Sequence, residues 1–75
     1  MKIYIVDSKN ERKPMIVMES ELVSELKKKI QREYNMNDEV ELLYNGIILN
    51  DNEYLSDLDI TEGVTINYLG IFKAG

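Results

Sequence analysis

The chain has 75 residues, nine of them basic and fourteen acidic, so its formal net charge is −5. Hydrophobic residues make up 44% and charged residues 31%, which is the composition of a folded globular chain and argues against disorder. At this length we expect one domain, spanning residues 1–75. The absence of cysteine excludes a disulfide framework and a thiolate zinc site, so the hydrophobic core must support the fold alone.

The charges are divided unevenly along the chain. Residues 1–32 hold eight of the nine bases, and no positive charge occurs between Glu33 and Phe72. The second half cannot offer phosphate groups a basic surface, so we expect no binding of nucleic acid. No apolar run approaches the ~20 residues of a membrane span, and the N-terminus lacks a signal-peptide pattern. We therefore expect no membrane association and a location in the cytoplasm, the nucleus or both.

The first part of the chain has the alternation of two strands. Ile3 and Ile5 share one face of residues 1–7, and the β-branched content favours a strand. Residues 12–18 resume as a second strand, which forms a hairpin with the first. Pro14 has no N–H to donate, so we expect this second strand at an edge of the sheet.

Residues 20–34 have the periodicity of an amphipathic helix. Its apolar residues recur at helical spacing, and they are Val23, Leu26, Ile30 and Tyr34. Ser20 is expected to be the N-cap, because a serine hydroxyl accepts a hydrogen bond from the first helical turn. Acidic residues precede basic ones, an order that suits the helix dipole.

The second part of the chain predicts another hairpin and a closing strand. The dipeptide Asn45-Gly46 is the strongest hairpin signal, because a type I′ turn needs positive φ at both central residues. The expected elements are strands at 40–44, 47–49 and 64–72 and a single helical turn at 55–58. Two hairpins flanking one helix, with the last strand parallel to the first, make an α+β fold. This arrangement is the β-grasp, a mixed sheet of about five strands packed on one helix.

The chain resembles the ubiquitin family along its full length. Its start, M-K-I-Y-I, resembles the family's M-Q-I-F-V, and Y-N-G-I-I-L at 44–49 resembles F-A-G-K-Q-L. The segment Y-L-S-D-L-D-I at 54–60 resembles T-L-S-D-Y-N-I. The resemblance implies a ubiquitin-like domain in which Lys27 and Asp51 form a structural ion pair between helix and loop.

The resemblance also implies a surface for partners, because the family is recognised through an apolar patch on the sheet face away from the helix. Matching positions and strand parity place the candidate partner-binding residues there: Val6, Leu43, Gly46, Ile47, Leu69 and Ile71. The expected partners are proteins with ubiquitin-binding-type surfaces, such as the proteasome or shuttle factors, and the expected state is a monomer. The alternative interpretation is that scattered exposed aliphatic side chains have no partner.

The basic residues that surround this patch in the family are absent. Their positions hold Glu41, Ile47 and Ile71, which reverses one charge and neutralises two. We expect this change to impair docking on the family's activating enzyme and to create repulsion against acidic partners.

A covalent modifier, conjugated through the terminal carboxylate of Gly75, is the alternative function. Modifiers of the family end in Gly-Gly, whereas this sequence ends in Ala74-Gly75, and the methyl group is a small obstruction to threading a narrow channel. A sulfur carrier would need the same activated glycine and is less favoured by the motifs.

The sequence favours no catalytic function. It has no histidine and no cysteine, which removes the usual general base and the thiol nucleophile. No acidic segment has the spacing of a calcium loop, so we expect neither a metal nor a cofactor. The function predicted is therefore a non-catalytic protein-interaction module.

Overall fold

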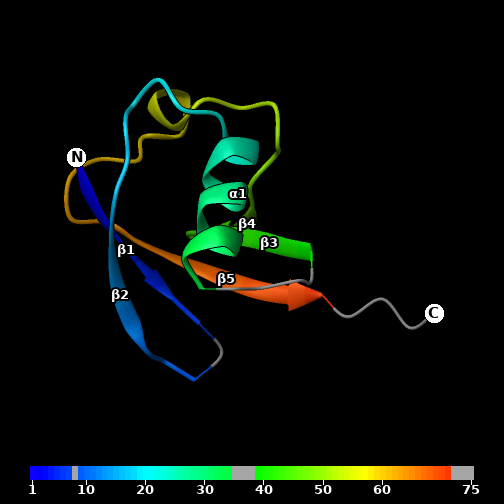
Figure 1. Ribbon diagram of the computed structural model, residues 1–75. Helices are drawn as coiled ribbons and strands as arrows, with labels where there is room; N and C mark the ends of the chain where they lie inside the picture. Colours follow the sequence, from blue (N-terminus) through cyan, green and yellow to red (C-terminus); the bar gives the residue numbers. More distant parts are fainter. Residues whose placement is uncertain (8, 35–38, 72–75) are drawn as a thin grey trace.

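The computed structural model describes residues 1–7, 9–34 and 39–71. The elements follow in the order β1 (Lys2–Val6), β2 (Arg12–Ile16), α1 (Val23–Glu33), β3 (Glu39–Tyr44), β4 (Ile47–Ile48), the 3₁₀-helix η1 (Leu55–Leu58) and β5 (Thr65–Ile71). The strands form one sheet in the order β2-β1-β5-β3-β4, and α1 lies across one face of it (Figure 1). This is the α+β β-grasp fold that the sequence predicts.

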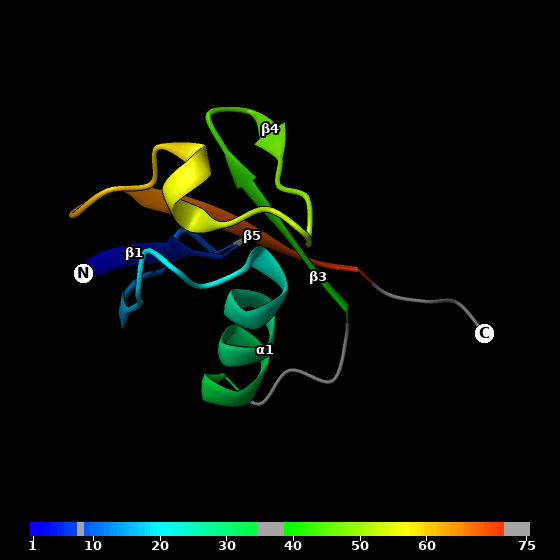
Figure 2. The same cartoon turned by 90° about the horizontal axis from the view of Figure 1, so that it is seen from above.

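The sheet is mixed because β1 and β5 are parallel, whereas each hairpin is antiparallel. β5 runs between β1 and β3 in the middle of the sheet, as Figure 2 shows. β2 pairs only with β1, so Pro14 lies in an edge strand, as expected from its missing N–H. At the β3–β4 turn, Asn45 has φ 54° and Gly46 has φ 77°, which confirms the positive φ that the hairpin signal requires.

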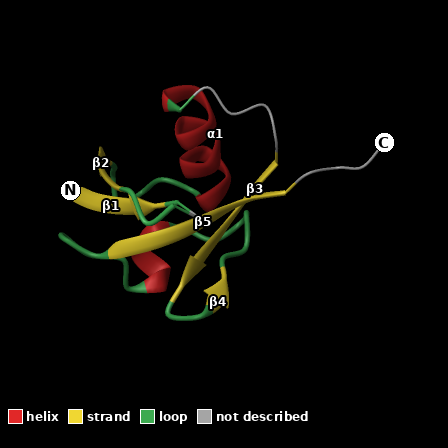
Figure 3. Cartoon of the chain, turned by 90° about the horizontal axis from the view of Figure 1, so that it is seen from below, coloured by secondary structure: helices red, strands yellow, loops and turns green. Residues whose placement is uncertain are grey.

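The hydrophobic core lies between α1 and the sheet, which form the two layers visible in Figure 3. The helix contributes Val23, Leu26 and Ile30, all fully buried. The strands contribute the side chains of one parity, which are Ile3, Ile5, Met15, Val40, Leu42, Ile66 and Tyr68. Because these alternate side chains are committed to the core, Val6, Leu43 and Leu69 between them lie on the face away from the helix, whereas the Glu41 carboxylate reaches Lys27 of α1 at the edge of that layer.

The helix begins later than the sequence predicts, and the Ser20 N-cap is wrong. Leu22 is the N-cap residue, and it forms an isolated antiparallel bridge with Tyr54 just before η1. This pairing holds Leu22 extended, so helical dihedral angles begin only at Val23. Because leucine has no side-chain acceptor, the cap comes from Glu25, whose Oε1 accepts a 3.2 Å hydrogen bond from the Leu22 N–H.

Candidate interaction surface

The candidate site lies on the sheet face that α1 does not cover. The register aligns one row of residues across four strands: Val6 of β1 is opposite Asn67 of β5, Asn67 is opposite Leu43 of β3, and Leu43 is opposite Ile48 of β4. Each has a buried chain neighbour, which is Ile5, Leu42 or Leu49 for the three aliphatic residues and both Ile66 and Tyr68 for Asn67, so all four face outward. Leu69 follows Asn67 on the same face of β5, two residues further along. We call Val6, Leu43, Ile48 and Leu69 the outer patch.

The outer patch is apolar and accessible. Ile48 is 61% exposed and Leu69 47% exposed, whereas Val6 and Leu43 are half-buried between their neighbours. Val6 and Leu43 lie in the inner strands β1 and β3, and the side chains of Ile48 and Leu69 are more accessible to solvent. Such a surface can bury further apolar area against another protein, which is the main favourable contribution to association.

The structure brings together three of the candidate residues, Val6, Leu43 and Leu69. Ile47 is 66% exposed but lies opposite Tyr44, at the register position next to that of Leu43. Gly46 is exposed in the hairpin turn beside it.

The other two candidates lie at or beyond the end of β5. The backbone of Ile71 is opposite Glu39 at the end of this strand, and its side chain lies outside the described residues. Gly75 also lies outside the described residues.

Ile48 is the member of the outer patch that the sequence prediction missed. A two-residue turn at Asn45-Gly46 places residue 44 opposite 47 and residue 43 opposite 48. Counting outward from the turn would therefore have assigned Ile48 to the side of Leu43.

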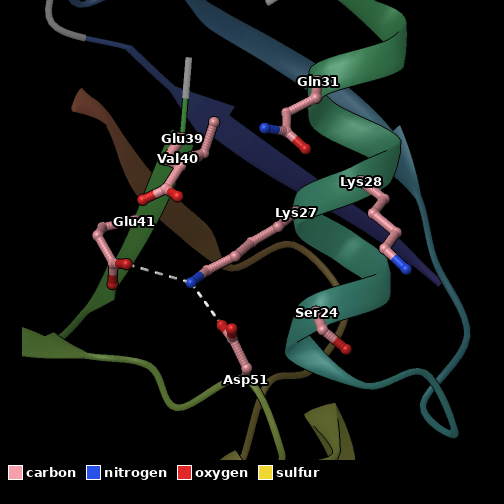
Figure 4. A pocket seen from close by; sticks show the side chains of 8 residues that line it. All are labelled: Ser24, Lys27, Lys28, Gln31, Glu39, Val40, Glu41 and Asp51. Carbon is pink, nitrogen blue, oxygen red and sulfur yellow. Dashed lines mark hydrogen bonds and ion pairs between the residues drawn. The ribbon is translucent and has the colours of Figure 1, made fainter. Parts of the chain in front are cut away.

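A groove between α1 and β3 holds a three-residue ion-pair cluster, which Figure 4 shows from close by. Lys27 Nζ lies 2.5 Å from Asp51 Oδ1 and 3.4 Å from Glu41 Oε1. The Lys27 side chain is only 13% exposed. Burial lowers the pKa of Lys27, but its hydrogen bonds and charge attraction to Asp51 and Glu41 outweigh burial, so the pKa is raised above the ordinary value. The ammonium therefore stays charged and links the helix to both β3 and the loop.

Glu41 also marks a charge reversal, because the ubiquitin-like pattern has a positively charged residue at this position. Its carboxylate is a partner of Lys27 and precedes Leu43 by two residues in β3. The charge reversal therefore removes a base beside the outer patch and also adds a contact that holds β3 to α1.

Two stacked tyrosines predict that the stability of the protein depends on alkaline pH. The rings of Tyr34 and Tyr68 are parallel, with centroids 6.4 Å apart. Burial raises the pKa of both phenols above the ordinary value of about 10. A raised pKa means that their contribution to folding is complete below about pH 10 and is lost as the pH rises through the folded-state values. We expect the free energy of unfolding to fall above about pH 10, and to fall less steeply in Tyr68→Phe.

The measurement is urea unfolding of the wild type and of Tyr68→Phe at about pH 8 and about pH 11. Lys27 remains in the variant and its raised pKa acts in the same direction, so the alkaline loss is reduced rather than abolished. Equal losses in the two proteins would contradict the role of Tyr68.

Among the described residues, no group of histidine, cysteine, aspartate or glutamate side chains is arranged to hold a metal ion. Within the same part of the chain, no helix has the length and apolar character needed to cross a membrane.

Comparison with known proteins agrees with the fold. Residues 4–71 match the model of the ubiquitin family, and this range includes every strand and the helix apart from the first two residues of β1. A search of curated proteins gives no significant match. Because the family model covers nearly the whole chain and the sheet has the β-grasp order, the chain belongs to the ubiquitin family.

Proposed function

We propose that this protein is a non-catalytic ubiquitin-like interaction module, which presents the outer patch to partner proteins. The observation that carries the proposal is the alignment of Val6, Leu43 and Ile48 in one cross-strand row, with Leu69 beside it. These apolar side chains come from four strands and meet on one face. Isolated exposed aliphatic residues need no explanation, but apolar side chains gathered from four strands on one face, with Asn67 among them, are suited to binding.

Membership of the ubiquitin family supports partners with ubiquitin-binding-type surfaces, including proteasomal receptors and shuttle factors. These partners operate in the cytoplasm and the nucleus, and we propose the same location for this protein. The proposal needs no catalytic group and no cofactor, because apolar contact supplies the affinity.

The proposal is tested by titrating ubiquitin-binding domains and proteasomal ubiquitin receptors against wild type and Leu43→Arg. We expect Leu43→Arg to weaken binding by at least about tenfold, because it puts a solvated cation at the half-buried centre of the patch. Met18→Arg is the matched control, since Met18 is 65% exposed, follows β2 and lies outside the patch. This control should bind within about twofold of wild type. Equal binding by wild type and Leu43→Arg would remove the outer patch as the site.

A covalent modifier is distinguished from an interaction module in cells. Slower-migrating adducts that vanish when Gly75 is deleted would identify a modifier conjugated through that residue. We expect binding that depends on Leu43 and does not require Gly75.

A further inference from the structure

The two edge strands of the sheet differ in length. β4 has two residues, Ile47–Ile48, whereas β2 has five, Arg12–Ile16. β2 pairs only with β1, at one margin of the sheet (Figure 1). The backbone of an edge strand carries N–H and C=O groups that pair readily with another chain. The outer side of β2 is therefore the side on which a further strand would add.

Hydrogen bonds at the end of the first hairpin show which backbone groups of β2 point outward. The Val17 N–H donates to Met1 O at 2.8 Å, and the Met1 ammonium donates to Val17 O at 2.7 Å, so both groups of Val17 point toward β1. In an antiparallel ladder this direction alternates from residue to residue. The even-numbered residues of β2 therefore direct their backbone groups away from β1, and they are Arg12, Pro14 and Ile16.

Pro14 is the central residue of this outward row, and it has no N–H to donate. A strand laid along β2 would lose its central hydrogen bond and meet the pyrrolidine ring instead. The end of the row is also covered, because Lys29 Nζ of α1 donates to Ile16 O at 3.3 Å. An ion pair of 2.8 Å with Glu21 holds the same ammonium in place. Two separate groups thus close the outer side of β2.

The side chains of this edge favour pairing with a copy of themselves. Residues 14–18 read P-M-I-V-M and contain no charge. Ile16 is 67% exposed and Met18 is 65% exposed, so apolar surface remains on the strand after folding. Short uncharged segments rich in apolar and β-branched residues are the ones that associate with identical segments, and flanking charges or proline oppose this. The occupant that fits the edge is a second copy of β2.

Two copies of β2 paired antiparallel about residue 14 would not oppose like charges. In this register Arg12 lies opposite Ile16 of the second copy, and Lys13 lies opposite Met15. The two residues at position 14 would each donate to and accept from the other. Proline removes both of these central hydrogen bonds at once.

We infer that β2 is a self-association edge whose occupant is a second copy of this chain, and that Pro14 keeps it closed. The contact lies along the edge of the sheet, outside the outer patch, so the inference does not depend on the proposed function. A closed edge leaves the domain monomeric and its outer patch free for other proteins.

The test is Pro14→Val, which restores the N–H and supplies a β-branched side chain suited to a strand. In sedimentation equilibrium, the variant should self-associate at least about tenfold more tightly than wild type. With rising protein concentration, amide hydrogen exchange should slow more at residues 12, 14 and 16 than at 13 and 15, which already bond to β1. Pro14→Thr restores the same donor with a polar side chain and should also associate.

The matched control is a synthetic chain with N-methylvaline at position 14, which keeps the added side chain and lacks the donor. It should stay as monomeric as wild type. Pro14→Val/Ile16→Lys should also be monomeric, because its new charge would lie opposite Arg12 of the second copy. Pro14→Val/Ile48→Lys is changed on the other edge strand and should self-associate as Pro14→Val does.

Urea unfolding of dilute protein first establishes that each variant is folded. Folded Pro14→Val and Pro14→Thr proteins that stay monomeric, or a wild type that is already a dimer, overturn the inference. Self-association of the N-methylvaline chain would assign the effect to the side chain and overturn the role of the missing donor. Loss of association in Pro14→Val/Ile48→Lys alone would place the contact at β4 and overturn the β2 edge. All these outcomes are separate from the Leu43→Arg titration that tests the proposed function.

Discussion

We expect Leu26→Ala to lower the free energy of unfolding by about 2–5 kcal/mol. Leu26 is fully buried near the start of α1, where the helix packs on the sheet. The substitution removes its transfer free energy and leaves a cavity that the neighbouring strands can only partly close. The total stability of a 75-residue domain is about 4–11 kcal/mol, so this one side chain accounts for much of it.

Urea unfolding followed by far-UV circular dichroism measures the effect, with Lys28→Ala as the control on the same helix. Lys28 is exposed, so its replacement should change the free energy of unfolding by no more than about 0.5 kcal/mol. A Leu26→Ala protein as stable as this control would contradict the packing of α1 on the sheet.

We expect Lys27→Met to lower the free energy of unfolding by about 2 kcal/mol, which lies between the values of exposed and buried ion pairs. Methionine keeps most of the packing volume but removes the ammonium between two carboxylates. Glu41 and Asp51 are then left near each other without the cation that both contact. Their like charges repel, although their partial exposure to solvent limits the penalty.

A double-mutant cycle separates charge from packing at this site. In a Glu41→Gln/Asp51→Asn background, Lys27→Met should cost less than about 1 kcal/mol, because the carboxylates that needed the cation are gone. The same cost in both backgrounds would mean that Lys27 acts through packing alone. The cycle also bears on the interaction surface, since Glu41 is joined to α1 by Lys27 and lies two residues before Leu43.

The elements could be predicted because each depends on residues close together in sequence. The apolar spacing of Val23, Leu26 and Ile30 defines the buried stripe of a helix wherever that helix lies. The Asn45-Gly46 turn depends on the φ preferences of two residues, and strand parity separates Leu42 from Leu43 in the same way. The fold order and the outward direction of the central patch residues follow from these local rules.

Contacts between distant segments decided the rest. Ser20 has the chemistry of an N-cap, but the bridge between Leu22 and Tyr54 delays the helix, and no local signal reports a partner 32 positions away. Lys27 contacts Glu41 as well as Asp51, because the fold places both carboxylates within reach of its long side chain. The sequence alone does not specify that second contact.

The sequence by itself determined the helix, the strands, the turn and the uneven charge along the chain. Only the tertiary structure decided how those charges share a surface. Register places Arg12 in one row with Val6, Leu43 and Ile48, whereas Glu41 of β3 lies in the groove against α1, where it contacts Lys27. The physical reason is that alternation specifies which face a side chain takes, whereas pairing between strands distant in sequence specifies its neighbours on that face.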